Sequence, residues 1–278
     1  MSKLKKTNTR MSLSRIGVLF CAFSLLVLSS CGRDDDRVII EDKREFNAEE
    51  LQVMSTFLEE SISDNSTFVV INPQSTSEIA AFYEYLDRIY QSLVNTERVT
   101  NRNKFIWVIH VLQDEESKNT FITPGGAMYI TTAMLKTIQT EHELISILAH
   151  EICYADNGLL LEKIKSEYDG TVLFQIINGQ NPTELLEMAA SLKNISFTEE
   201  EVIAADNYAV DIICDFLYDP HGMRDFTKRA ISNELQLDWM DNRPGTVDRS
   251  KLIEQAASGC GPGGIFEDRY QGFLKKLQ

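Results

Sequence analysis

Two adjacent residues, His150 and Glu151, are the side chains in this sequence best suited to chemistry on a metal-bound water molecule. In the pattern H-E-x-x-H, two histidines four residues apart share one helix face and bind one zinc ion. The glutamate between them takes a proton from the water on that ion. In this chain Tyr154 stands at the position of the second histidine. The dipeptide alone is therefore a weak signal, and its meaning depends on the surrounding elements.

Three capping-box patterns, in which Ser, Thr or Asn precedes Glu by three residues, predict where helices begin. The helices that they open are expected to run to about residues 62, 155 and 218, and a further helix with one buried face follows residue 73. Shorter helices are expected near 223–237, 247–257 and 266–277. The three pairs are Asn47 with Glu50, Thr140 with Glu143, and Thr198 with Glu201.

Strand signals are few. The run FIWVIHVL between Lys104 and Gln113 is apolar on both alternating faces, which predicts a strand buried between layers, with His110 as a core histidine. The turn Pro124-Gly125-Gly126 separates two short apolar runs and predicts a hairpin. The expected fold class is therefore mainly α with a small β-sheet, an α+β fold.

The first thirty residues predict a lipoprotein signal peptide. Five lysines and arginines precede an uncharged apolar run, Ile16 to Leu28, that is too short to cross a bilayer comfortably. The run ends in Ser29-Ser30-Cys31-Gly32, which resembles a bacterial lipobox, so Cys31 is expected to carry the lipid. We expect a signal peptide at 1–30, an acidic tether at 31–45 and one domain at 46–278. The predicted location is the bacterial cell envelope, on the periplasmic face or the outer surface.

The net charge and the cysteine spacing limit the partners and the metal sites that the chain can have. Without its leader, the chain keeps 22 of its 27 basic residues against 42 acidic ones, a net charge of about −20. Nucleic acid is therefore excluded as a partner, and contact with the membrane is expected through the lipid on Cys31. Cys153, Cys214 and Cys260 lack C-x-x-C spacing, so they predict no metal knuckle. One disulfide is possible among these three, and the sequence leaves the pair open.

Two longer stretches give the dipeptide its context. Asn119 to Thr131 and Glu143 to Ile152 resemble the HtpX-like and CaaX-prenyl-protease family of zinc metallopeptidases, metallopeptidase family 48, especially its periplasmic and lipoprotein members. The resemblance extends from about Asn72 to Arg249. It implies a zincin or gluzincin-like fold with one zinc ion.

Carried over position by position, the resemblance implies three functional residues that this chain retains. His150 matches the first zinc ligand and Glu151 matches the general base. Asp206 matches the carboxylate that orients a ligand histidine.

Three other positions depart from the family. Tyr154 replaces the second ligand histidine and Val202 replaces the ligand glutamate. Arg243 replaces the histidine that would stabilise the tetrahedral intermediate, and it is expected to pair with Glu151 or with a peptide carboxylate. Losing two ligands weakens zinc binding by roughly four orders of magnitude, so zinc is expected to be weak or absent here. Val202 also fits a hydrophobic staple with Phe197.

A different metal site near His150 is an alternative. Cys153 lies three residues after His150, on the same helix face, so a mixed nitrogen and sulfur site is conceivable. Asp156, Asp211 and His142 are the other nearby candidates, although His142 is expected to be a surface residue and Asp156 to cap or face solvent.

The resemblance further implies that the strand after the Pro-Gly-Gly turn is an edge strand that pairs with an extended peptide. The second interpretation is an ordinary hairpin that supports the helix. The residues expected to bind peptide are Gly126, Ala127, Met128, Tyr129 and Ile130.

These observations predict a lipid-anchored envelope protein with a catalytically impaired metallopeptidase-like domain that binds a peptide or an envelope protein. The alternative is an active zinc-dependent metalloendopeptidase with an atypical ligand set, acting in envelope protein quality control. A structural scaffold in an envelope assembly is a third possibility.

Overall fold

The computed structural model of the protein describes residues 44–243 and 249–277. Contacts between residues divide the chain after Glu41, and every element named below belongs to the second unit, Asp42–Gln278. The predicted signal peptide, Cys31 and nearly all of the predicted tether lie outside the described residues, so those predictions stay predictions.

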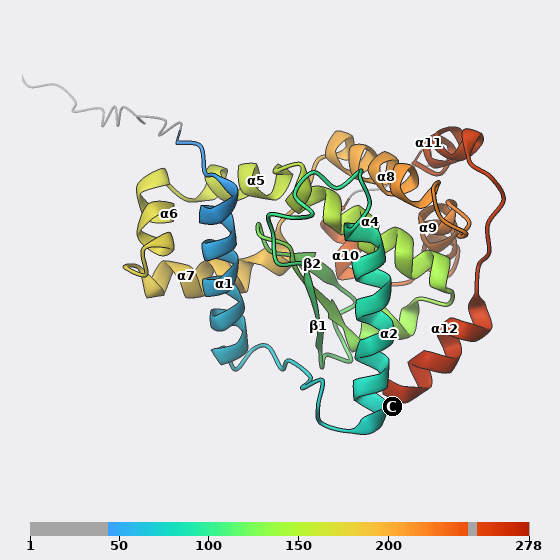
Figure 1. Cartoon of the computed structure of the whole chain (residues 1–278), viewed down its shortest axis with the longest axis horizontal. Helices are drawn as coiled ribbons and strands as arrows, with labels where there is room; N and C mark the ends of the chain where they lie inside the picture. Colours follow the sequence, from blue (N-terminus) through green and yellow to red (C-terminus); the bar gives the residue numbers. More distant parts are fainter. Residues whose placement is uncertain (1–43, 244–248, 278) are drawn as a thin grey trace, which may run out of the picture. The chain divides into compact units, whose positions relative to one another are not determined.

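Helices make up most of the described chain, together with three short strands (Figure 1). The predicted fold class, mainly α with a small sheet, is confirmed. The strands are β1 (Val108–Leu112), β2 (Thr120–Ile122) and β3 (Ala127–Thr131), and the 3-10 turns are η1 (Leu192–Asn194), η2 (Ala257–Gly259) and η3 (Lys275–Leu277). The α-helices are α1 (Ala48–Asp64), α2 (Ser77–Val94), α3 (Thr132–Thr137), α4 (Glu141–Asp156), α5 (Leu159–Glu167), α6 (Gly170–Ile177), α7 (Pro182–Ser191), α8 (Glu199–Ile213), α9 (Gly222–Ser232), α10 (Asp238–Asp241), α11 (Arg249–Ala256) and α12 (Glu267–Leu274).

Two of the three predicted capping boxes are present, at the start of α1 and at the start of α8. The third prediction, at α4, is wrong, although that helix begins where expected. The Thr140 side chain caps no backbone N–H and instead lies 2.7 Å from His142 Nδ1. The Glu143 carboxylate accepts a hydrogen bond from Gln139 N, at 2.8 Å, and pairs with Arg229.

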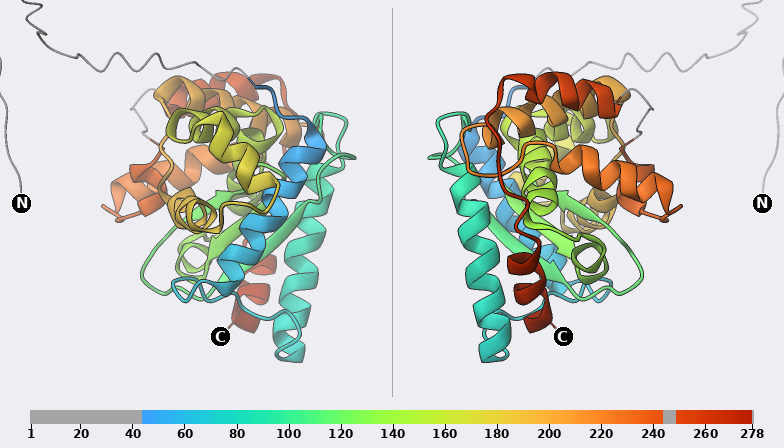
Figure 2. Two further views of the ribbon diagram at one scale, coloured as in Figure 1. Left: turned by 90° about the vertical axis from the view of Figure 1, so that its left-hand side faces the viewer. Right: turned by 90° about the vertical axis from the view of Figure 1, so that its right-hand side faces the viewer.

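Helix α4 lies in the core, and every one of its residues is buried. It packs against α2, α8, α9 and strand β2 (Figure 2). Three helices that the sequence patterns did not predict, α5, α6 and α7, follow it, and α6 and α7 pack against α1. A polar side chain on α4 is therefore shielded from solvent and must find its partners within the protein.

The sheet has the strand order β1-β3-β2, with β1 parallel and β2 antiparallel to β3. The predicted hairpin is therefore present as β2 and β3, and its turn includes Gly126 at φ 96°, where an added Cβ would meet the Trp107 ring. The expected edge strand is wrong, because β3 is central and both of its sides are hydrogen-bonded. The stretch from Gly126 to Ile130, expected to bind peptide, has no main-chain edge to offer.

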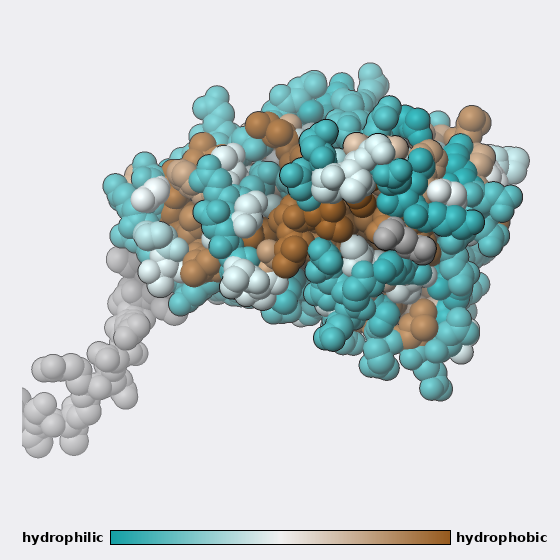
Figure 3. All heavy atoms as spheres, turned by 90° about the horizontal axis from the view of Figure 1, so that it is seen from below, coloured by the Kyte–Doolittle hydropathy of each residue, from teal (hydrophilic) through white to brown (hydrophobic). Residues whose placement is uncertain are grey.

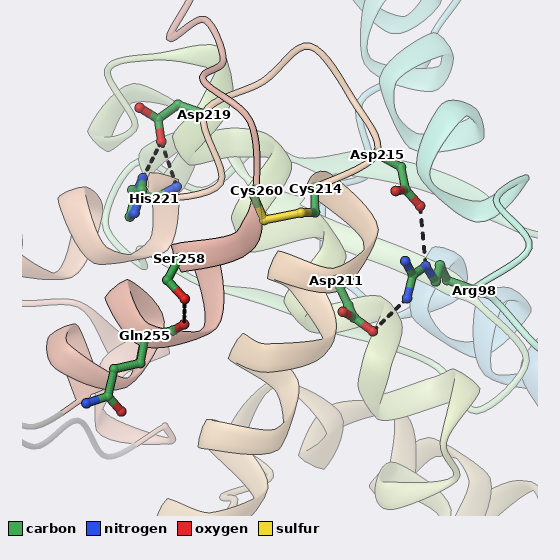
Figure 4. The surroundings of a disulfide bond; sticks show 9 residues. All are labelled: Arg98, Asp211, Cys214, Asp215, Asp219, His221, Gln255, Ser258 and Cys260. Carbon is green, nitrogen blue, oxygen red and sulfur yellow. Dashed lines mark hydrogen bonds and ion pairs between the residues drawn. A yellow bond between two sulfur atoms is a disulfide. The ribbon is translucent and has the colours of Figure 1, made fainter.

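A disulfide between Cys214 and Cys260 joins the end of α8 to the chain that follows η2 (Figure 4). This answers the pairing question that the sequence left open, and Cys153 is a free, buried thiol. The same region is held by a main-chain hydrogen bond from Gly264 N to Leu217 O, at 2.8 Å. The disulfide therefore ties the C-terminal segment to the helix that faces α4.

One face of the molecule is hydrophilic for the most part, with apolar residues gathered in a band across its middle (Figure 3). Several large apolar side chains of the described residues are exposed, among them Ile106 and Leu217. No single helix within 44–243 or 249–277 is long and apolar enough to cross a membrane, and the bent pair of α4 and α5 passes that test only together.

Candidate functional site

The residues that the sequence singled out come together between α4 and α8, which pack closely against each other. On α4, His150 and Tyr154 share a face because they are four residues apart, and Glu151 follows His150. Asp206 and Val202 have the same spacing on α8. All of these side chains are buried, so each polar atom needs a partner inside the protein.

Both ring nitrogens of His150 are engaged. Nδ1 lies 2.8 Å from Asp206 Oδ1, and Nε2 lies 2.8 Å from the hydroxyl of Tyr154. A carboxylate accepts hydrogen bonds only, so Nδ1 carries the proton and Nε2 accepts the Tyr154 hydroxyl. Burial lowers the pKa of His150, against the opposing effect of Asp206, and burial raises the pKa of Tyr154 well above its ordinary value. The pair is therefore a neutral imidazole and a neutral phenol.

Asp206 has a second partner, Arg249, at the start of α11. The guanidinium donates to both carboxylate oxygens, with Nε–Oδ2 at 2.5 Å and Nη2–Oδ1 at 2.8 Å. Burial would raise the pKa of Asp206, but Arg249 and His150 hold it below its ordinary value. The carboxylate is therefore ionised and charge-paired in the core.

Glu151 is fully buried, and both of its oxygens accept hydrogen bonds. Oε2 accepts from Arg243 Nη2 at 2.7 Å, and Oε1 accepts from the indole nitrogen of Trp239 at 2.7 Å. The predicted pairing of Arg243 with Glu151 is therefore present in the structure.

Arg243 lies in a surround of aromatic rings. Its guanidinium carbon is 5.4 Å from the ring centroid of Tyr154, 5.5 Å from that of Phe197 and 5.3 Å from that of Trp239. The Tyr154 and Phe197 rings stack at 3.6 Å between centroids. Cation–π attraction and the ion pair with Glu151 therefore hold the Arg243 side chain in position.

The chain from Leu237 to Arg243, here called the covering segment, lies against the outer edge of β2. Trp239 N donates to Lys118 O, just before the strand, at 3.2 Å. Arg243 Nη2 donates to Thr120 O, within the strand, at 3.4 Å. The side of the sheet next to Glu151 is thus occupied by the protein's own chain.

Sequence reasoning missed two members of this cluster. Trp239 was not singled out, although it is one of two tryptophans in the chain and follows the acidic residue Asp238. Arg249 was placed within the resemblance but given no role. Its partner Asp206 is 43 residues away, and no local pattern reports such a pairing.

These residues do not fit a zinc ion. Val202, where the resemblance implies a ligand glutamate, has no donor atom and is fully buried. Tyr154, where it implies the second histidine, directs its hydroxyl to the one His150 nitrogen that could bind a metal. Glu151, where it implies the general base, is held by two donors. Each family position is thus apolar or already satisfied by a neighbour.

The alternative site with Cys153 is not assembled either. Burial raises the pKa of the Cys153 thiol to about 12, so the thiolate that binds metals is disfavoured. Both oxygens of Asp156 accept from the backbone N–H groups of Thr100 and Asn101, at 3.0 and 2.7 Å, so its carboxylate caps a turn.

The remaining candidates lie apart from the cluster. Asp211 pairs with Arg98 at the surface, at 2.9 Å (Figure 4). His142 was expected at the surface but is buried, and it contacts Thr140 and Asp225. Throughout the described ranges, no group of three or more His, Cys, Asp or Glu side chains is arranged to hold a metal ion.

Comparison with known proteins gives several relatives. The chain is 28% identical to the human mitochondrial metalloendopeptidase OMA1 over 156 residues, which cover 55% of this chain and 28% of the relative. It is 23% identical to the mitochondrial metalloendopeptidase OMA1 of Schizosaccharomyces pombe over 181 residues, 62% of this chain and 52% of the relative. The chain thus spans about half of the length of these relatives or less.

The sequence pattern of peptidase family M48 matches residues 81–257, which is more than half of the chain and includes α4, α8, the covering segment and Arg249. The fold agrees with that match. The chain belongs to peptidase family M48.

Proposed function

We propose that this chain is a non-hydrolytic member of its family that binds a peptide or an envelope protein. The observation that carries the proposal is the state of Glu151. A general base must come within about 2.6–3.2 Å of the group whose proton it removes, so it must be accessible to water or substrate. Each oxygen of Glu151 already accepts a hydrogen bond, one from Arg243 and one from Trp239, and the side chain has no exposed surface.

Binding is proposed to use the outer surface. Strand β3 is central, and the covering segment lies on the outer edge of β2, so neither strand offers a free edge to a peptide near Glu151. Large exposed apolar side chains are a common feature of protein-binding surfaces, and the apolar band in Figure 3 supports a partner on that face.

We further propose that the protein is exported and held in the bacterial cell envelope by a lipid on Cys31. The leader pattern of residues 1–30 supports this location. The disulfide between Cys214 and Cys260 gives independent support, because disulfides form and persist in oxidising compartments such as the periplasm.

The alternative function is a zinc-dependent metalloendopeptidase with an atypical ligand set. Its support is the name of the relatives, which are metalloendopeptidases, and the retained His150–Asp206 pair. That function requires the cluster around Glu151 to open and other residues to complete the metal site.

Metal analysis and a protease assay test the proposal. The protein is purified without a histidine tag, dialysed with zinc and then against buffer, and its zinc content and casein cleavage are measured. We expect far less than one zinc per chain and no cleavage above that of the Glu151→Gln variant. One zinc per chain that is lost on His150→Ala, with cleavage that is lost on Glu151→Gln, would overturn the proposal.

A further inference from the structure

We propose that Arg243 takes over the charge role of the metal in this chain, and that it excludes zinc even when the missing ligands are restored. This inference rests on the non-hydrolytic function proposed above and gives its physical cause. It starts from Glu151, whose carboxylate is fully buried. A buried carboxylate without a cation is strongly destabilising, so a fold that keeps this residue must supply a positive charge.

Arg243 supplies that charge at the carboxylate itself. Its Nη2 atom lies 2.7 Å from Glu151 Oε2, and its side chain is 3% exposed. Asp206 does not compete for it, because Asp206 has its own bidentate partner in Arg249. The cluster therefore contains two carboxylates and two guanidinium groups, each carboxylate with its own cation.

The exchange conserves charge. A zinc ion brings two positive charges, and the ligand glutamate implied at position 202 brings one negative charge, which together leave one positive charge. Arg243 brings the same single positive charge, and Val202 brings none. A guanidinium in place of the metal is thus matched by an apolar residue in place of its anionic ligand.

Two of the three replaced positions, Tyr154 and Arg243, also pack together, with Phe197 between them and the start of α8. Tyr154 stacks on Phe197, Phe197 precedes the helix that carries Val202, and the Arg243 guanidinium lies 5.4 and 5.5 Å from the ring centroids of Tyr154 and Phe197. Restoring one of these two positions alone would therefore leave the other in its metal-free arrangement.

This arrangement predicts how the site can be reopened. The substitutions Tyr154→His and Val202→Glu restore two ligand side chains. The Arg243 guanidinium is still bound to the Glu151 carboxylate, and it repels a divalent cation at short range. Adding Arg243→His removes that charge. We expect the triple variant to bind one zinc per chain on the order of 100-fold more tightly than the double variant.

The experiment compares wild type, Arg243→His, the double variant and the triple variant as the full processed chain without a histidine tag. Zinc stoichiometry is measured by mass spectrometry of the metal, and the dissociation constant by titration with zinc alone. Circular dichroism and thermal unfolding check each fold. The double variant binding zinc as tightly as the triple variant would overturn the role of Arg243.

A second pair keeps the test decisive where the added buried carboxylate of Val202→Glu prevents folding. Tyr154→His is compared with Tyr154→His combined with Arg243→His, and zinc uptake is expected only in the second of these; equal uptake contradicts the inference. Failure of the proposed function looks different, because wild type would then itself carry one zinc per chain. If wild type carries no zinc and the variants with and without Arg243→His bind zinc equally, only the Arg243 inference is contradicted.

Discussion

Glu151 keeps the residue type that the resemblance implies for a general base, and both of its carboxylate oxygens are held in the core, by Arg243 and by Trp239. Its position next to His150, on the core helix α4, follows from the sequence pattern. Its state depends on Arg243 and Trp239, which lie 92 and 88 residues further along the chain. Residue type is a local property, whereas the partners and the burial of a carboxylate depend on tertiary contacts.

Arg243→Met tests how much the buried ion pair matters at this scale. Removing the guanidinium leaves Glu151 buried without a cation, so the free energy of unfolding should fall by about 3–5 kcal/mol. Adding Glu151→Gln to that variant removes the stranded charge and should recover a large part of the loss. Urea unfolding of wild type, both single variants and the double variant gives the coupling energy.

The expected coupling between the two residues is at least about 2 kcal/mol, as for buried charge pairs in direct contact. Additive effects of the two substitutions would mean that the pair contributes nothing as a pair. In that case Arg243 would be held by its aromatic neighbours alone.

Among single residues, His150, Glu151 and Asp206 were found from sequence, because family motifs fix their positions. The pairing of Arg243 with Glu151 was also predicted, as one of two partners for the guanidinium, because a carboxylate attracts a cation at a neighbouring position. The hydrogen bond from Tyr154 to His150 was not. It follows from the spacing of four residues once Tyr154 is known to be a buried, neutral phenol.

At the scale of elements, the first turn of α4 explains why one capping prediction was wrong. The backbone N–H groups of Glu141 and His142 donate to Ile265 O, at 3.1 and 3.3 Å. The Glu143 carboxylate, which would complete the box, pairs with Arg229, and a segment from the C-terminal part of the chain satisfies the first two N–H groups of the helix. Such a partner is more than 100 residues away, so the local pattern around Thr140 could not show it.

Sequence patterns placed α1, α2, α4 and α8 because each has either a cap or a clear apolar face. They did not place α5, α6 and α7. These helices are short, with 9, 8 and 10 residues, so each holds too few turns to show a clear apolar period in the sequence. The order of the strands was beyond reach for another reason: a hairpin fixes which strands are neighbours but does not show which of them lies at the edge.

Asp225 links α9 to the first turn of α4 and should make stability depend on pH. Burial would raise its pKa, but His142 and Arg224 hold the pKa at about 2, below the ordinary value of 3.8. A lowered folded-state pKa stabilises the fold above the unfolded value, and this contribution is lost as the pH falls from about 4 toward 2. Asp225→Asn should therefore lower the free energy of unfolding at pH 7 by about 1 kcal/mol, after a discount for its partly exposed side chain.

Urea unfolding at pH 7, 5 and 3 measures this effect. The difference between wild type and Asp225→Asn should be similar at pH 7 and 5 and smaller at pH 3. Asp64→Asn, at an exposed position in α1, is the control and should change stability by no more than about 0.5 kcal/mol at pH 7. A constant difference at all three pH values would contradict the contribution assigned to Asp225.

At the scale of the whole molecule, the disulfide and the leader pattern of residues 1–30 support the proposed export for independent physical reasons. The leader is a pattern of charge and hydropathy in residues 1–30. The disulfide depends on the folded positions of Cys214 and Cys260, which are 46 residues apart in sequence. The chain's strongly acidic composition adds that the protein body is repelled by anionic lipid surfaces, so a membrane attachment would rest on the lipid.

Moving the protein to the cytoplasm tests both features together. A variant without residues 1–30 should stay in the reducing cytoplasm, so Cys214 and Cys260 should remain thiols. Without the disulfide, the loop of 46 residues is no longer closed, and the free energy of unfolding should fall by roughly 4 kcal/mol on the chain-entropy account.

A second variant, with residues 1–31 exchanged for the leader of a secreted protein, should form the disulfide but leave the membrane fraction. Thiol counting after denaturation, urea unfolding and membrane fractionation measure the three outcomes. A disulfide in the cytoplasmic variant would remove the link between export and oxidation, and membrane retention of the second variant would show an attachment that does not need the lipid on Cys31.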